Sequence, residues 1–137
     1  MSVRQSERSE SSLEFLKELR DLEVYIIKRS AVKPKKYKFF IAEHFLNPAA
    51  KAYSLAKMGN TIYPATPEDV AMRRKYMYES CCHIQGLIGQ LEVFYAVFEG
   101  DGLSKCEMEE LSGKLYKVDV LMRGVLKKDR ERYKNIK

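Results

Sequence analysis

Residues 66–98 read TPEDVAMRRKYMYESCCHIQGLIGQLEVFYAVF, and this stretch decides the fold class of the 137-residue chain. It opens with a helix-start pattern, because Thr66 can cap the first turn and Pro67 suits the first helical position. Apolar residues follow at a step of seven and then at alternating steps of four and three, at Val70, Met77, Cys81, Ile84, Ile88, Leu91, Tyr95 and Phe98. This heptad-like stripe predicts one long helix that packs against other helices.

The chain before this stretch predicts two more helices. The first covers about residues 12–30 and starts at the capping box of Ser11 and Glu14. The second covers about residues 35–58 and carries an apolar stripe with Pro48 inside it. Because proline lacks a backbone N–H and clashes with the carbonyl four residues earlier, we expect a kink, a break or a new helix start there.

The chain after this stretch predicts a fourth helix, which reaches about residue 133. Ser104 and Glu107 form its capping box. Its apolar residues again alternate at threes and fours, at Met108, Leu111, Leu115, Val118, Met122 and Val125. Four helices joined by short loops predict an all-α fold, an antiparallel up-down-up-down four-helix bundle at residues 12–134, preceded by a disordered tail at residues 1–11.

The composition indicates a folded basic protein. Hydrophobic residues make up 45% of the chain, which is ordinary for a globular domain. The net charge of +6 favours a polyanionic partner. Three cysteines, two of them adjacent, do not make a disulfide framework and predict reduced thiols in the cytoplasm. Because we find no signal peptide and no apolar run of about 18 residues, we expect no membrane partner.

Catalytic patterns are scarce, so we expect a protein that is not an enzyme and holds no metal or cofactor. His44 and His83 are the two histidines, and neither follows a glutamate by three residues, as a di-metal bundle site requires. The cluster Cys81-Cys82-His83 would diverge around a helix, so buried cysteine is the simpler interpretation. A metal- or thiol-dependent enzyme remains the weakest hypothesis.

Gly86 and Gly89 interrupt the third helix, although each costs up to about 1 kcal/mol relative to alanine. Close packing inside the bundle and close packing between subunits explain them equally well. Leu87, Phe94 and Val97 lie off the main stripe, which favours a self-interface.

Basic residues gather in three parts of the chain: the loop between the first two helices, the start of the third helix and the end of the fourth. Helix dipoles favour cations at a C-terminus but not at the start of the third helix. The bundle would place these groups at its two opposite ends and thus predicts two basic regions. We expect nucleic-acid binding by Lys33, Lys35, Lys36, Lys38, Arg73, Arg74, Lys75, Arg123, Lys127, Lys128, Arg130 and Arg132. The interleaved aromatic residues that could stack on bases are Tyr37, Phe39, Tyr76, Tyr78 and Tyr133.

The pattern over residues 13–133 resembles the Avd-type proteins, the accessory variability determinants of diversity-generating retroelements. The stretches that carry the resemblance are Pro34-Lys35-Lys36-Tyr37-Lys38-Phe39, Gly59-Asn60, Gln85 to Val97, and Leu103-Ser104. The resemblance implies a non-enzymatic homopentamer that binds RNA or DNA and a reverse transcriptase. Such a protein supports mutagenic copying of a template RNA into cDNA.

Two alternatives remain. A sister group of bundle proteins is encoded within intervening sequences of 23S rRNA, but its Ser-Ile-Pro-Ser-Asn-Ile-Ala-Glu-Gly-like stretch is replaced here by residues 45–52, FLNPAAKA. Pro48 departs from both families. The other alternative is a plain protein-interaction module whose charge serves solubility.

Overall fold

The computed structural model describes residues 2–98 and 101–135, with side chains from residue 14 onward. Its elements are α1 (Ser2–Ala31), α2 (Lys35–Ile41), the π-helical turn η1 (Ala42–Leu46), α3 (Asn47–Thr61), α4 (Pro67–Phe98) and α5 (Lys105–Arg132). Because α2, η1 and α3 continue into one another, the described residues form four helical rods and no strand. The prediction of an all-α fold with four helices is confirmed.

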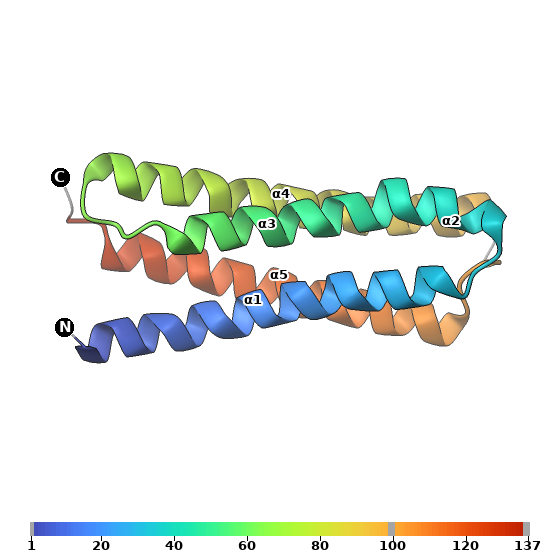
Figure 1. The fold of residues 1–137 in the computed structure, drawn as a ribbon, viewed down its shortest axis with the longest axis horizontal. Helices are drawn as coiled ribbons and strands as arrows, with labels where there is room; N and C mark the ends of the chain where they lie inside the picture. The colour runs from blue at the N-terminus through green and yellow to red at the C-terminus, as the bar shows by residue number, and fades with distance from the viewer. Residues whose placement is uncertain (1, 99–100, 136–137) are drawn as a thin grey trace.

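The rods lie side by side along the long axis of the molecule (Figure 1). α1 and α4 each pack on both α3 and α5, which closes a four-sided bundle. One end, here called the α2 end, holds residues 28–38 and 101–107 (Figure 1). The opposite end, here called the terminal end, holds both chain termini together with residues 57–75 and 127–135 (Figure 1).

Helix α1 begins at Ser2, about ten residues before the predicted helix start near residue 12, while disorder of the tail stays a prediction. The capping box of Ser11 and Glu14 lies inside the helix. Residues 2–11 contain neither glycine nor proline, and nothing in their sequence stops the helix from extending.

Pro48 does not break the second rod, because the π-helical turn comes directly before it. The backbone N–H of Asn47 donates to the carbonyl of Ala42, five residues earlier. This wider turn relaxes the four-residue repeat that would press the proline ring against the carbonyl of His44. The chain therefore stays helical from Lys35 to Thr61.

Helix α4 buries a face that is rotated from the predicted one and shares Met77, Ile84 and Leu91 with it. Its buried residues are Arg73, Met77, Ser80, Ile84, Leu87, Leu91 and Phe94. Tyr95, which the sequence placed in the core, is 55% exposed, and Cys81 and Ile88 are half-buried. Leu87 and Phe94, which the sequence placed off the stripe, are core residues.

This shift is caused by polar residues in the buried stripe of α4. Arg73 and Ser80 occupy two positions of the true stripe, so a pattern built on apolar residues alone selects the neighbouring register. Ser80 is satisfied inside the core because its hydroxyl donates to the carbonyl of Ala52 at 2.7 Å. Helix α3 presents Ala49, Ala52, Ala56 and Gly59 as its buried residues, and these small side chains bring its backbone close to α4.

The predicted starts of the last two helices are confirmed. At the start of α4 the backbone N–H of Asp69 donates to the Thr66 hydroxyl at 3.2 Å, and the Asp69 carboxylate accepts from the backbone of Thr66 at 3.1 Å. At the start of α5 Ser104 and Glu107 make both bonds of a capping box. In α5 the predicted stripe is buried from Leu111 to Val125.

One stretch of α4 is long and apolar enough to count as a candidate membrane span by length and composition alone, although the sequence analysis expects no such run. A core helix of a globular bundle can pass the same test. Only 22% of that stretch is buried, so α4 leaves apolar surface uncovered.

Candidate nucleic-acid interface

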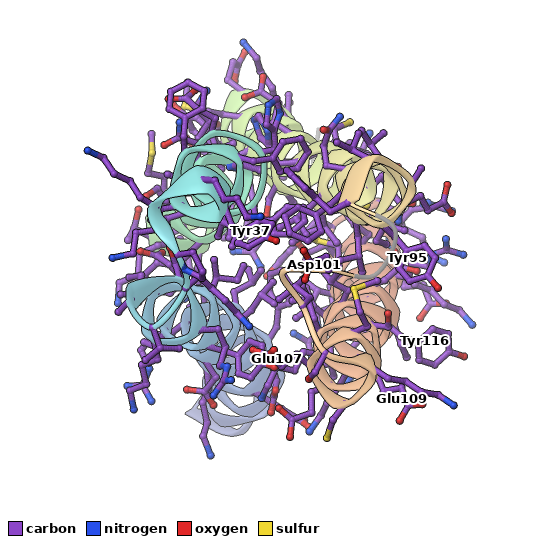
Figure 2. All side chains as sticks on the ribbon, turned by 90° about the vertical axis from the view of Figure 1, so that its right-hand side faces the viewer. Tyr37, Tyr95, Asp101, Glu107, Glu109 and Tyr116 are labelled. Atoms are coloured by element: carbon purple, nitrogen blue, oxygen red, sulfur yellow. The ribbon has the colours of Figure 1, made fainter. Side chains whose placement is uncertain are left out.

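At the α2 end, Glu107 forms ion pairs with one cation of α1 and one of the loop that follows α1. Its carboxylate accepts from the Arg29 guanidinium at 2.6 Å and from the Lys33 ammonium at 2.5 Å. It also accepts from the backbone N–H of Ser104 at 3.0 Å. Figure 2, which looks onto this end, shows Glu107 close to the ribbon of α1.

This environment changes the acidity of Glu107. Burial by itself would raise the pKa of the carboxyl group, but the hydrogen bonds from Lys33, the Ser104 backbone and Arg29 outweigh it and lower the pKa to about 2. Glu107 therefore stays charged at neutral pH and fastens α1 to the first turn of α5.

Lys33 is not available to a nucleic acid. Its side chain is 12% exposed and paired with Glu107, so the prediction that it binds nucleic acid is wrong. Sequence reasoning identified Glu107 as a cap and missed its second role, because its two cationic partners lie more than 70 residues away in the chain.

Three other predicted lysines at this end, Lys35, Lys36 and Lys38, are exposed on α2. Lys36 lies over the ring of Tyr37 at 4.9 Å and 4.0 Å from Asp101. The hydroxyl of Tyr37 donates to Asp101 at 2.6 Å and lowers the pKa of that carboxyl group. Lys35 and Lys38 make no ion pair within the described residues and remain open to phosphate.

Of the aromatic residues at this end, Tyr37 is buried and cannot stack on a base, which corrects that prediction. It packs edge-on against Phe98, with ring centroids 5.0 Å apart. Phe39 is 74% exposed between the lysines and can stack.

At the terminal end, Arg73 is a structural residue. Its side chain is 2% exposed, and its guanidinium donates to Asp129 at 2.6 and 3.3 Å. A third bond runs to the carbonyl of Gly59 at 3.2 Å. Arg73 thus ties α4 to α5 and to the end of α3, and the prediction that it binds nucleic acid is wrong.

The cations around it face solvent. Six predicted residues at this end are exposed: Arg74, Lys75, Lys127, Lys128, Arg130 and Arg132. A cleft of about 10 Å³ between the start of α4 and the end of α5 is lined by Arg74, Tyr78, Arg130 and Tyr133 and by the ion pair of Arg73 and Asp129. This space admits about one water molecule, so Arg74 and Arg130 can contact a phosphate only at the surface of the protein.

Arg123 does not belong to either end. It pairs with Asp119 at 3.2 Å, and Asp119 also accepts from Gln85 in the middle of α4 at 2.7 Å. The prediction that Arg123 joins the basic end of α5 is therefore wrong, because residue 123 lies more than two helical turns from the end of that helix.

The middle of the bundle carries more acids than cations. The acids there are Glu14, Glu18, Asp21, Glu23, Glu43, Glu79, Glu92, Glu109, Glu110 and Asp119, and the cations are Lys17, Arg20, Lys51, Lys114, Lys117 and Arg123. Arg20, Lys117 and Arg123 are each paired with a carboxylate, on Asp21, Glu18 and Asp119 respectively. Lys17, Lys51 and Lys114 make no ion pair among the described residues, but acids outnumber cations in the middle, so the excess of positive charge lies at the two ends.

The cysteine and histidine side chains of the described residues do not come together in a metal site. Among the described residues, no group of His, Cys, Asp and Glu side chains is placed to hold a metal ion. Cys82 and Cys106 are exposed, and burial raises the pKa of the Cys81 thiol. His44 and His83 line one open groove between the second rod and α4.

No family model, no curated protein and no solved structure gives a significant match to this chain.

Proposed function

We propose that this chain is a non-enzymatic accessory subunit that binds RNA and a reverse transcriptase in the cytoplasm and assists mutagenic copying of a template RNA into cDNA. Its framework is an antiparallel up-down-up-down four-helix bundle without cofactor or membrane anchor. The observation that carries RNA binding is the pair of basic ends, where exposed cations remain after Lys33 and Arg73 are set aside. The reverse transcriptase and a five-chain assembly are implied by the resemblance to Avd-type proteins.

The helix dipole accounts for Arg130 and Arg132, which lie in the last turn of α5, but not for the cations at the start of α2 or in the second and third turns of α4. Arg74 and Lys75 are the eighth and ninth residues of α4 and lie far from its C-terminus, so the helix dipole does not favour cations there. Lys35 is the first residue of α2, and neither Lys35 nor Lys38 makes an ion pair with an acid among the described residues. A polyanionic ligand is the simplest reason for such an arrangement.

The test is binding of a single-stranded RNA, followed by fluorescence anisotropy at rising salt. Each phosphate contact with a single strand contributes roughly 0.7 to the slope of log K against log salt. The variant R74Q/R130Q should bind more weakly and lose about 1.4 from that slope, if each arginine contacts one phosphate. The matched variant K17Q/K51Q, in the middle of the bundle, should bind as the wild type does. Salt-independent binding, or no binding at low salt, contradicts the proposal.

The partner is identified by pull-down of the tagged protein from its host, with both protein and RNA analysed. A reverse transcriptase with one dominant structured RNA supports the proposal. Ribosomal RNA alone favours the intervening-sequence group.

A second candidate function, a plain protein-interaction module that also self-associates, is favoured by the outer face of α4. A methyl group added at Gly86 or at Gly89 would meet no atom within 4 Å, so packing inside the bundle does not explain these glycines. Val93 and Val97 are 43% and 60% exposed on the same helix. Tyr95 and Tyr116 point away from the bundle axis (Figure 2).

A further inference from the structure

We propose that the two basic ends bind separate segments of nucleic acid at the same time, so that each chain holds two RNA segments together. This inference rests on the proposed RNA binding and adds a tethering activity to it. It follows from three features of the bundle: the distance between the ends, the acids between them and the rigidity of the rods.

The ends are too far apart to act as one electrostatic site. Helix α4 runs from one end to the other over 32 residues, which corresponds to about 48 Å at 1.5 Å per residue. The screening length at physiological salt is about 8 Å. A phosphate held at Arg74 and Arg130 therefore gains nothing from Lys35 and Lys38.

The middle of the bundle opposes a strand that would run from one end to the other. Exposed acids such as Glu14, Glu43 and Glu92 outnumber the exposed cations that make no ion pair there, Lys17 and Lys51. A backbone that carries one charge per nucleotide would be repelled along that path. Two separate nucleic-acid segments, one at each basic end, avoid the repulsion that one continuous strand would meet along the middle of the bundle.

The packed helical rods hold the two basic ends at a fixed distance from each other. Ion pairs lock both ends of the bundle: Glu107 joins α1 to α5 at the α2 end, and Arg73 joins α4 to α5 at the terminal end. The cations around these pairs are carried on helices whose relative positions are set by packing. Two RNA segments bound to one chain would stay within tens of ångströms of each other, which raises their effective concentration.

The experiment uses RNA duplexes of 8 base pairs, which at roughly 3 Å per pair or less are too short to reach both ends. The number of duplexes bound per chain is measured at low salt by sedimentation velocity with labelled RNA. Three matched double variants are compared with the wild type: K35Q/K38Q at the α2 end, R74Q/R130Q at the terminal end, and K17Q/K51Q in the middle. Counting per chain keeps the result independent of the number of chains in an assembly.

We expect two duplexes per wild-type chain, one per chain in each end variant, and two in K17Q/K51Q. The wild type should also capture a labelled duplex on beads that carry an unlabelled one. One duplex per wild-type chain, or two in either end variant, overturns the tethering inference while RNA binding stands. Absence of duplex binding overturns the tethering inference, and absence of binding to both the duplex and the single-stranded RNA overturns the proposed function as well.

Discussion

Single residues decide which cations of this protein are available to a ligand. Arg73 and Arg74 are neighbours in the chain, yet Arg73 is buried on Asp129 and Arg74 faces solvent. Lys33 and Lys35 differ in the same way, because the Glu107 carboxylate takes up Lys33. Neighbouring charges in a basic run therefore have different roles, and substitutions should separate them.

Replacement of Arg73 by glutamine should destabilise the bundle by about 3–5 kcal/mol, because Asp129 is left half-enclosed without its partner. Urea unfolding measures this change. Arg74→Gln serves as the control, since an exposed substitution should change the free energy of unfolding by less than about 0.5 kcal/mol. Equal stability of the two variants would show that the Arg73 pair does not hold the terminal end together.

Glu107 should make stability depend on pH in the acid range. Folding lowers its pKa from the usual 4.5 to about 2, so the unfolded chain binds a proton more readily than the folded protein. The stabilisation is fully present above about pH 4.5 and is lost as the pH falls to about 2, with an upper limit on the order of 3 kcal/mol. In Glu107→Gln this part of the pH dependence should disappear from thermal unfolding curves. A variant that keeps the wild-type acid profile contradicts this role.

At the scale of the helix, two features depart from a regular, alanine-like α-helix: the π-helical turn before Pro48 and the glycines of α4. The buried residues around the π-helical turn, Tyr37, Ile41, Phe45 and Ala49, follow one another at three successive steps of four. Such a run drifts around a regular α-helix of 3.6 residues per turn, and the wider turn cancels the drift. That spacing was a sequence signal for the π-helical turn.

Deletion of Glu43 should therefore be tolerated only when Pro48 is also replaced. Without one residue of η1 the rod becomes a regular α-helix, and Pro48 then costs about 3 kcal/mol. The combined change of Glu43 deletion and Pro48→Ala should restore most of that loss, because the buried residues on both sides keep their faces. Circular dichroism during thermal unfolding gives the comparison. Equal stability of the single deletion and the wild type would contradict this account.

The glycines of α4 should respond to alanine in opposite ways inside and outside an assembly. In an isolated bundle, G86A/G89A should raise stability by up to about 1 kcal/mol per site, since the added methyl groups meet no atom. If another chain packs closely on this face, the same variant should weaken the assembly in sedimentation equilibrium. Unchanged association together with higher stability would mean that the glycines serve no close contact between chains.

At the scale of the whole molecule, like charges gathered at the ends repel one another when the protein is free. The chain carries +6 overall, and the middle of the bundle does not contribute to this excess. Such self-repulsion lowers stability and is screened by salt. The arrangement is what a protein built around two polyanionic contacts would show.

Added salt should accordingly raise the Tm of the free protein by a few degrees, and R74Q/R130Q should already have part of that increase at low salt. The variant K17Q/K51Q should lack this gain, because its lysines lie among acids. Differential scanning calorimetry over a salt series makes the comparison. A Tm that falls with salt in the wild type would show that attraction between charges outweighs repulsion at the ends.

The sequence by itself determined the features that depend on neighbours within one helix. The caps at Thr66 and Ser104 and the apolar stripe of α5 are such features, because the interacting groups lie within a few residues of each other. Two basic ends were also predictable, since helix lengths and loops fix which segments meet.

Only the tertiary structure decided which face of α4 is buried and which cations remain free. Ser80 sits in the core because it finds the carbonyl of Ala52 on another helix. Arg73 and Lys33 are not available to a ligand, because they pair with acids that lie 56 and 74 residues away along the chain. A buried polar group is stable only with its partner in place, so its position is set by the packing of the rods and not by any local pattern.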